Sequence, residues 1–144
     1  MTFKSLNLRS EIIDVLPKTL EEPTEIQRKT IPVIAEKRDI LALAQTGSGK
    51  TLAFSLGVLH NLERNVEAVQ SLIMVPTREL ANQVTSSLEP FARALSIRIA
   101  TLIGGMSEES VNDTLNSRPQ MIVATPGRLV SLIEQSSLSL SQCQ

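Results

Sequence analysis

Aromatic side chains are almost missing from this sequence of 144 residues, which contains three Phe and neither Trp nor Tyr. Proteins that hold single-stranded nucleic acid by base stacking need aromatic platforms, so the scarcity argues against that kind of site. The charge is also nearly balanced, with 14 Lys and Arg against 15 Asp and Glu and a net charge of −1. A strongly basic surface is therefore not expected. Any contact with a polyanion has to come from a local group of residues or from backbone donors.

Cysteine, histidine and long apolar runs are equally scarce. The single cysteine, Cys143, has no disulfide partner within the chain, which suits a reducing compartment. The single histidine, His60, stands near the end of an apolar segment, and we expect a surface residue or a cap rather than a metal ligand. Residues 1–10 lack the apolar centre of a secretory signal, and no apolar run approaches the length of a membrane span. We expect a cytoplasmic protein that does not contact a membrane.

The apolar residues follow two different periods along the chain. Continuous apolar runs, which are typical of buried parallel strands, occur at 40–44, 72–75, 97–103 and 121–124. Elsewhere apolar residues recur every three or four positions, which predicts helices over 10–16, 24–35, 51–62, 79–95, 107–115 and 128–133. Strands that alternate with helices predict an α/β fold with a parallel sheet flanked by helices. The Ser-rich residues 136–144 are expected to form a loop.

A glycine-rich segment follows the first expected strand and opens the next expected helix. It consists of Ala44, Gln45, Thr46, Gly47, Ser48, Gly49, Lys50 and Thr51. Glycines at 47 and 49 allow backbone N–H groups to turn inward around phosphates, and the helix N-terminus adds partial positive charge. Lys50 would reach the β- and γ-phosphates, and the Thr51 hydroxyl would be a ligand of Mg²⁺. The pattern predicts a phosphate loop, although Ala44 replaces the usual first glycine and a plain Gly-rich turn is the alternative.

The later junctions between strand and helix carry three more motifs. The second expected strand leads into Pro76-Thr77-Arg78-Glu79-Leu80, the third into Gly104-Gly105, and the fourth into Thr125-Pro126-Gly127-Arg128. With the phosphate loop, this series resembles the first RecA-like domain of the DEAD-box ATP-dependent RNA helicases, which carries the same motifs in the same order. The resemblance implies an enzyme that uses ATP and Mg²⁺ and binds RNA. The RNA contacts that it implies are Pro76, Thr77, Arg78, Gly104, Gly105, Thr125, Gly127 and Arg128.

The geometry of parallel α/β folds favours these contacts. The carboxyl ends of parallel strands meet at one edge of a sheet, where open α/β folds bind ligands. Helix N-termini at that edge offer unpaired N–H groups to phosphates without reading bases. Each motif also has a structural explanation, with Thr77 as an N-cap, Gly104-Gly105 as a turn and Pro126 as a first-turn proline. The order of all the motifs together favours function.

An upstream segment, Pro23-Thr24-Glu25-Ile26-Gln27, resembles the part of this family that reads adenine, with Phe3 as the aromatic that accompanies it. The Gln27 amide offers one donor and one acceptor, which match adenine N7 and N6. Thr24 and Gln27 are also the required pair of a helix capping box, and one side chain can serve both purposes. The family usually has a Gly-aromatic pair where this chain has Thr19-Leu20. We expect an adenine-recognition segment at 1–38 and part of a RecA-like ATP-binding domain at 39–144.

Acidic residues are nearly missing after Thr125, since Glu134 is the only one. Phosphoryl transfer needs a further acid linked to Mg²⁺ and a residue that positions water, which this family takes from Asp-Glu-Ala-Asp on another strand. The resemblance therefore implies a P-loop, RecA-like fold that is incomplete at its C-terminus and depends on the remainder of the helicase as its partner. We expect the 144-residue chain to be inactive alone. The alternatives are a non-catalytic nucleotide-binding module that acts through a partner and, less favoured, another P-loop ATPase such as a kinase.

Overall fold

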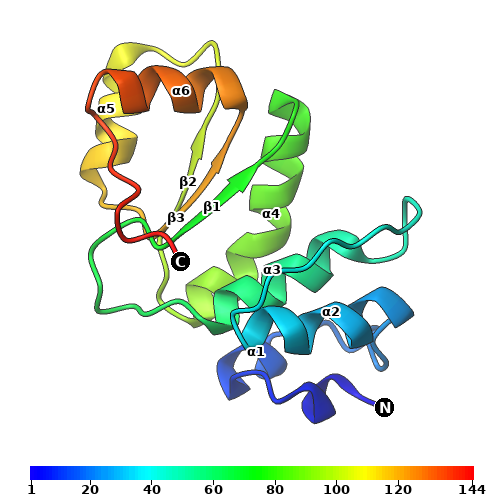
Figure 1. Ribbon diagram of the computed structural model, residues 1–144. Helices are drawn as coiled ribbons and strands as arrows, with labels where there is room; N and C mark the ends of the chain where they lie inside the picture. Colours follow the sequence, from blue (N-terminus) through cyan, green and yellow to red (C-terminus); the bar gives the residue numbers. More distant parts are fainter. The chain divides into compact units, whose positions relative to one another are not determined.

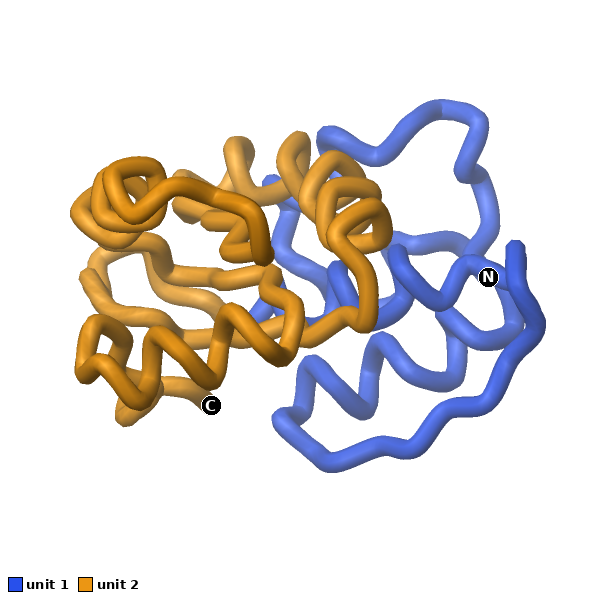
Figure 2. Tube along the Cα trace, turned by 90° about the horizontal axis from the view of Figure 1, so that it is seen from above, with its two compact units in different colours: residues 1–61 blue, residues 62–144 orange.

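The computed structural model describes residues 1–144, and the chain divides into two compact units, Met1–Asn61 and Leu62–Gln144 (Figure 2). The sheet belongs to the second unit. None of the helices combines the length and the apolar composition that crossing a bilayer requires. The boundary that we expect after residue 38 separates functional segments rather than compact units, and it stays a prediction.

The first unit is helical and contains η1 (Phe3–Leu6), α1 (Ser10–Asp14), α2 (Glu25–Ala35) and α3 (Lys50–His60) (Figure 1). Helices α2 and α3 pack closely because Gly57 has no side chain: a Cβ atom there would lie 2.7 Å from Ile34 Cβ. The Asn61 amide closes the same contact by donating to the carbonyl oxygen of Ile34 at 2.8 Å. The three helices expected in this part of the chain are confirmed, with ends shifted by one or two residues.

Residues 40–44 form no strand, so the expectation for this segment was wrong. The side chains of Leu41 and Leu43 are each 90% exposed. An apolar run becomes a strand only where a neighbouring strand supplies ladder hydrogen bonds, and the sheet of this chain has only three strands, none of which includes 40–44. Apolar composition therefore predicted neither the burial nor the strand correctly here, because it carries no information about a pairing partner.

The second unit is built on a parallel sheet of β1 (Ser71–Met74), β2 (Ile99–Leu102) and β3 (Met121–Ala124), in the order β1-β3-β2. Met121 lies opposite Ser71 on one side and opposite Ile99 on the other. The three later strands predicted from the sequence are thus confirmed, with slightly different ends. Because β3 is the central strand, all four of its residues are buried.

Helices cover both faces of this sheet. On one face lies α4 (Arg78–Ala94), which is joined to β2 by a hydrogen bond of 2.6 Å between the hydroxyls of Thr85 and Thr101. On the other lie α5 (Glu108–Asn116) and α6 (Pro126–Glu134) (Figure 1). Their core cluster includes Val69, Ala100, Leu102, Val111, Ile122, Ala124, Leu129 and Leu132. The connection through α4 runs from β1 past β3 to β2, and the connection through α5 runs back from β2 to β3. Because both crossovers are right-handed but run in opposite directions, α4 and α5 lie on opposite faces of the sheet.

The amino end of the sheet is held by a buried glutamine. Gln120 is fully buried, and its Oε1 accepts the N–H of Arg98 at 3.0 Å. Its Nε2 donates to the carbonyl oxygens of Arg64 at 2.8 Å and Val66 at 3.1 Å. The segment that leads into β1 is therefore tied to the strand that becomes its neighbour.

The residues after α6 contain no helix or strand, as expected for a loop. Leu138, Leu140 and Cys143 nevertheless pack against the core cluster beside α5 and α6. The N–H of Gln144 donates to the carbonyl oxygen of Gln70 at 3.0 Å.

Candidate functional site

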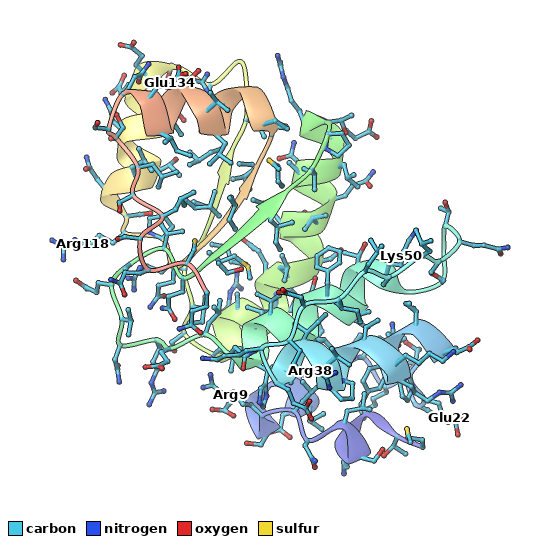
Figure 3. All side chains as sticks on the ribbon, viewed as in Figure 1. Arg9, Glu22, Arg38, Lys50, Arg118 and Glu134 are labelled. Atoms are coloured by element: carbon cyan, nitrogen blue, oxygen red, sulfur yellow. The ribbon has the colours of Figure 1, made fainter.

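The glycine-rich segment forms a loop that runs into the first turn of α3. Gly47 and Gly49 both adopt the left-handed region, with φ of 80° and 90°, which residues with side chains seldom do. The N–H of Ser48 donates to the carbonyl oxygen of Gln45 at 3.2 Å and closes a turn. Lys50 begins α3 (Figure 3), and its Nζ donates to the carbonyl oxygen of Ala44 at 2.5 Å. The exposed ammonium group therefore lies over the loop, where it is free to exchange this carbonyl for a phosphate.

The start of α2 is joined to this loop through Gln27. The capping box is present: the N–H of Thr24 donates to Gln27 Oε1 at 2.9 Å, and the N–H of Gln27 donates to Thr24 Oγ1 at 3.5 Å. The same Gln27 donates from Nε2 to the carbonyl oxygen of Gly49 at 3.2 Å. A Cβ atom at position 49 would lie 2.4 Å from that Nε2. Glycine is therefore needed at 49 for its φ angle and for the approach of Gln27.

A pocket of about 470 Å³ lies between the start of α2 and the loop, within the size range of small-molecule sites. Its lining consists of Thr24, Glu25, Ile26, Lys29, Leu43, Ala44, Gln45 and Ser48. The Ser48 hydroxyl is buried and has no hydrogen-bond partner. Because buried hydroxyls are normally paired, this atom is available to a polar ligand. The pocket therefore joins residues of the expected adenine-reading segment to residues of the expected phosphate loop.

The residues at this pocket fit a nucleoside triphosphate better than a free metal ion. No group of three or more His, Cys, Asp or Glu side chains could hold a metal. A Mg²⁺ ion would therefore depend on phosphate oxygens, with the Thr51 hydroxyl on the first turn of α3 as its protein ligand. The unpaired Ser48 hydroxyl and the Lys50 ammonium supply the polar and cationic groups that a phosphate chain needs.

Lys29 was missed by the sequence analysis. It lines the pocket, and its Nζ pairs with Glu25 Oε1 at 2.6 Å. Spacing could have found it, because a residue one turn after Glu25 lies on the same side of the helix.

Phe3 lies apart from the pocket lining. Phe3 is the first residue of η1, a short helix that contacts α2, and its side chain is buried. The ring is 3% exposed, so little of its surface is open to a base as the chain stands. Its expected role beside the adenine stays a prediction.

Two of the remaining motifs meet at the carboxyl edge of the sheet, where parallel β1 and β2 both end. The guanidinium of Arg78 lies over Gly104-Gly105: Cβ atoms added there would fall 3.3 Å from Nη2 and 2.8 Å from Nη1. Gly105 has a φ of 84°, which again favours glycine. Pro76 and Thr77 precede Arg78, and Thr77 Oγ1 accepts the N–H of Leu80 at 3.1 Å, so the structural alternative for Thr77, an N-cap, is present. Its role as an RNA contact stays a prediction.

The last motif follows β3 at the same edge. Thr125 is the residue before α6 and makes no side-chain cap, Pro126 is the first residue of the helix, and Gly127 comes next. Arg128 turns toward the neighbouring loop: its Nε donates to the carbonyl oxygen of Ile103 at 3.1 Å and its Nη2 to that of Met106 at 3.3 Å. These acceptors could not be found from the sequence, because every residue has a backbone carbonyl.

The DEAD/DEAH box helicase family matches residues 24–144, which include the glycine-rich loop and the three later motifs. The chain belongs to the DEAD/DEAH box helicase family. It is 43% identical over 140 residues to the ATP-dependent rRNA helicase RRP3 of Yarrowia lipolytica, covering 94% of this chain and 28% of that protein. It is 44% identical over 142 residues to the ATP-dependent RNA helicase DeaD of Buchnera aphidicola subsp. Schizaphis graminum, covering 97% of this chain and 24% of that one.

A solved structure confirms the fold of this DEAD/DEAH box chain. The crystal structure of a hypothetical ATP-dependent RNA helicase from Sulfolobus tokodaii matches 94% of the chain with a TM-score of 0.83 and 31% identity, and the match covers 39% of that protein. The predicted RecA-like arrangement of a parallel sheet between helices is therefore correct. The chain spans about a quarter of the length of the curated relatives described above.

Proposed function

We propose that this chain is the N-terminal part of an ATP-dependent RNA helicase, with ATP bound at the loop 44–51 and the RNA backbone at the carboxyl edge of the sheet. The observation that carries the proposal is the hydrogen bond of 3.2 Å from Gln27 to Gly49. It joins the residue suited to reading adenine with the loop suited to holding phosphates, beside one pocket. The family match and the names of the relatives support the same reading.

At the nucleotide site, each residue has a separate task. The backbone N–H groups of 47–50 cradle the phosphates, and Lys50 neutralises their charge. Thr51 holds Mg²⁺ through its hydroxyl, and Gln27 selects adenine through its amide. When bound, ATP with its Mg²⁺ would supply the γ-phosphoryl group, and its transfer to water with ADP as the leaving group would be coupled to RNA strand separation in the intact enzyme.

At the RNA site, the donors are backbone groups and arginine. Arg78 is exposed and makes no hydrogen bond or ion pair, so all its N–H donors are available to phosphates. Contacts of this kind position a strand without reading its sequence. Such a surface explains how a chain with a net charge of −1 binds RNA.

The acid that completes hydrolysis lies outside this set of residues, so we propose that activity requires the remainder of the helicase. We also propose that the intact enzyme acts in the cytoplasm. In the intact enzyme, Lys50→Ala is expected to abolish RNA-stimulated ATP turnover, measured as phosphate release. Lys18→Ala, which removes an exposed lysine away from the pocket, is the matched control and should leave turnover intact. Normal turnover by the Lys50→Ala enzyme, or sustained turnover by the 144-residue chain alone, would contradict the proposal.

A further inference from the structure

Two arginines at the carboxyl edge of the sheet are used in different ways. Arg78 is exposed and makes no hydrogen bond or ion pair. Arg128 is half-buried, and two of its nitrogens already donate to carbonyl oxygens, Nε to Ile103 at 3.1 Å and Nη2 to Met106 at 3.3 Å. A guanidinium that is committed in this way has fewer donors left for a phosphate. The structure thus shows different hydrogen bonding for two arginines that occupy similar positions in their motifs.

The two carbonyls bracket the Gly104-Gly105 doublet. The turn from Ile103 to Met106 contains a weak side-chain contact of 3.5 Å, from the N–H of Ile103 to the sulfur of Met106. Two glycines in succession would leave such a turn with many accessible conformations. Arg128 donates to the carbonyl oxygens at both ends of the turn and so restricts these conformations.

The conformation of this turn decides what lies beneath Arg78. Cβ atoms at Gly104 and Gly105 would fall 3.3 Å and 2.8 Å from the Arg78 guanidinium, so the group rests on the bare backbone of the doublet. If the turn moved, the place of this guanidinium at the sheet edge would change with it.

We propose that Arg128 is a positioning residue. By donating hydrogen bonds to the carbonyl oxygens of Ile103 and Met106 it holds the Gly-Gly turn under Arg78, which makes the phosphate contact. The inference rests on the proposed RNA-binding function. It assigns the two arginines different roles: Arg78 contacts a phosphate, and Arg128 donates hydrogen bonds to the backbone of the turn. Lysine cannot replace Arg128 in this role, because one ammonium group cannot span two separate acceptors as the planar fork of a guanidinium does.

The test uses the intact enzyme, with a single-stranded RNA and a non-hydrolysable ATP analogue, and compares Arg78→Ala, Arg128→Ala and Arg128→Lys. Arg98→Ala is the matched control, because Arg98 Nε also donates to carbonyl oxygens, those of Ser117 and Arg118 at 3.0 Å, but precedes β2 at the opposite edge of the sheet. Two quantities are measured for each variant: the dependence of RNA affinity on salt, and hydrogen exchange of the amides in the turn.

We expect Arg78→Ala to lower the salt slope of RNA binding by about 0.7, the value for one phosphate contact to a single strand. Arg128→Ala and Arg128→Lys should weaken binding about tenfold, because Arg78 loses its alignment with the phosphate. Arg78 keeps its charge near the strand in these variants, so the salt slope should fall by less than in Arg78→Ala. Both should also speed exchange of the amides of 104–106 by about tenfold or more. Arg98→Ala should change neither RNA affinity nor exchange in this turn.

Opposite results overturn the inference. If Arg128→Lys binds RNA normally while Arg128→Ala loses salt slope as Arg78→Ala does, Arg128 contacts the phosphate itself. Unchanged exchange at 104–106 in Arg128→Ala would show that Arg128 does not hold the turn. An unmutated enzyme that binds no RNA would overturn the proposed function instead, and the exchange comparison, which needs no RNA, would still decide whether Arg128 holds the turn.

Discussion

Gln27 shows how one side chain can serve structure and recognition together. Its Oε1 caps α2 and its Nε2 binds Gly49, which leaves one N–H and one lone pair of the buried amide without a partner in the chain. We expect the intact enzyme to bind ATP well and GTP poorly, because the guanine O6 would face the amide oxygen as a second acceptor. Gln27→Ala should narrow a preference of roughly 10- to 100-fold, the effect of one unpaired buried group. Competition binding with both nucleotides measures it.

A second variant separates reading from capping. In Gln27→Glu, a carboxylate still accepts the N–H of Thr24, as capping boxes with Glu do, but it can donate neither to adenine N7 nor to the carbonyl oxygen of Gly49. This variant should keep α2 folded and lose the preference for ATP. Equal affinities for ATP and GTP in the unmutated enzyme would exclude adenine reading by Gln27.

His60 makes the first unit sensitive to pH. Its Nδ1 accepts the N–H of Arg9 at 3.2 Å, which requires the neutral ring, and burial together with the nearby Arg9 lowers the pKa of His60 below its ordinary 6.5. Between the lowered pKa of His60 in the folded state and 6.5, the unfolded chain binds more protons than the folded chain. The contribution of His60 to stability is therefore fully present above pH 6.5 and is lost as the pH falls through the pKa of the folded state.

The measurement is simple because this is the only histidine in the chain. An NMR titration of its ring should give a midpoint below 6.5, and denaturant unfolding should show less stability at pH 5.5 than at pH 7.5. His60→Gln, which keeps an acceptor without titrating, should reduce that difference. A midpoint at or above 6.5 would contradict the assignment.

At the scale of elements, the contact between α2 and α3 depends on a missing side chain. Gly57→Ala would place a Cβ atom 2.7 Å from Ile34 Cβ and 3.4 Å from the carbonyl oxygen of Ile31. Alanine favours a helix by about 1 kcal/mol over glycine, but overpacking costs about 1–3 kcal/mol, so we expect a net loss of up to about 2 kcal/mol in the free energy of unfolding.

Gly127→Ala is the matched control for this prediction, because the added Cβ atom would meet nothing within 4 Å in α6. Its free energy of unfolding should stay the same or rise slightly. Denaturant unfolding of both variants tests the comparison. If Gly57→Ala were as stable as the unmutated chain, the helix contact would be looser than the structure indicates.

At the scale of the molecule, the sheet has an open edge. The N–H groups of Ser71 and Val75 donate to β3, so in the alternating parallel ladder Leu72 and Met74 present their N–H and C=O groups to the other side of β1. No strand pairs with that side, and the side chain of Met74 is 59% exposed. Because such an edge is a template for pairing, we expect the 144-residue chain alone to be marginally stable and to self-associate.

Light scattering after gel filtration measures the association, with thermal unfolding beside it. Met74→Lys, which puts a charge on the edge, should shift the chain toward monomer. Val130→Lys removes a similarly exposed apolar side chain from α6 and should not. An unmutated chain that is monomeric and melts cooperatively at an ordinary mesophilic temperature would refute the prediction.

Much of this protein could be predicted from the sequence, because the relevant physics is local. Gly47 and Gly49 mark the loop through their permitted φ angles, and Thr24 and Gln27 mark a helix start through side chains that bond the nearby backbone. The helices follow from the spacing of apolar residues. The strand at 121–124 follows from four apolar residues in succession, which suit a place buried on both faces.

Only the tertiary structure decided the rest. Residues 40–44 are as apolar as the strands, yet they form none, because a strand exists only with a partner and the partner is chosen far along the chain. Arg78 and Arg128 read as equivalent in their motifs, but their different hydrogen bonds separate them. The acceptors that hold Arg128 are backbone carbonyls, which every residue carries, so only the path of the chain in space can bring them to it.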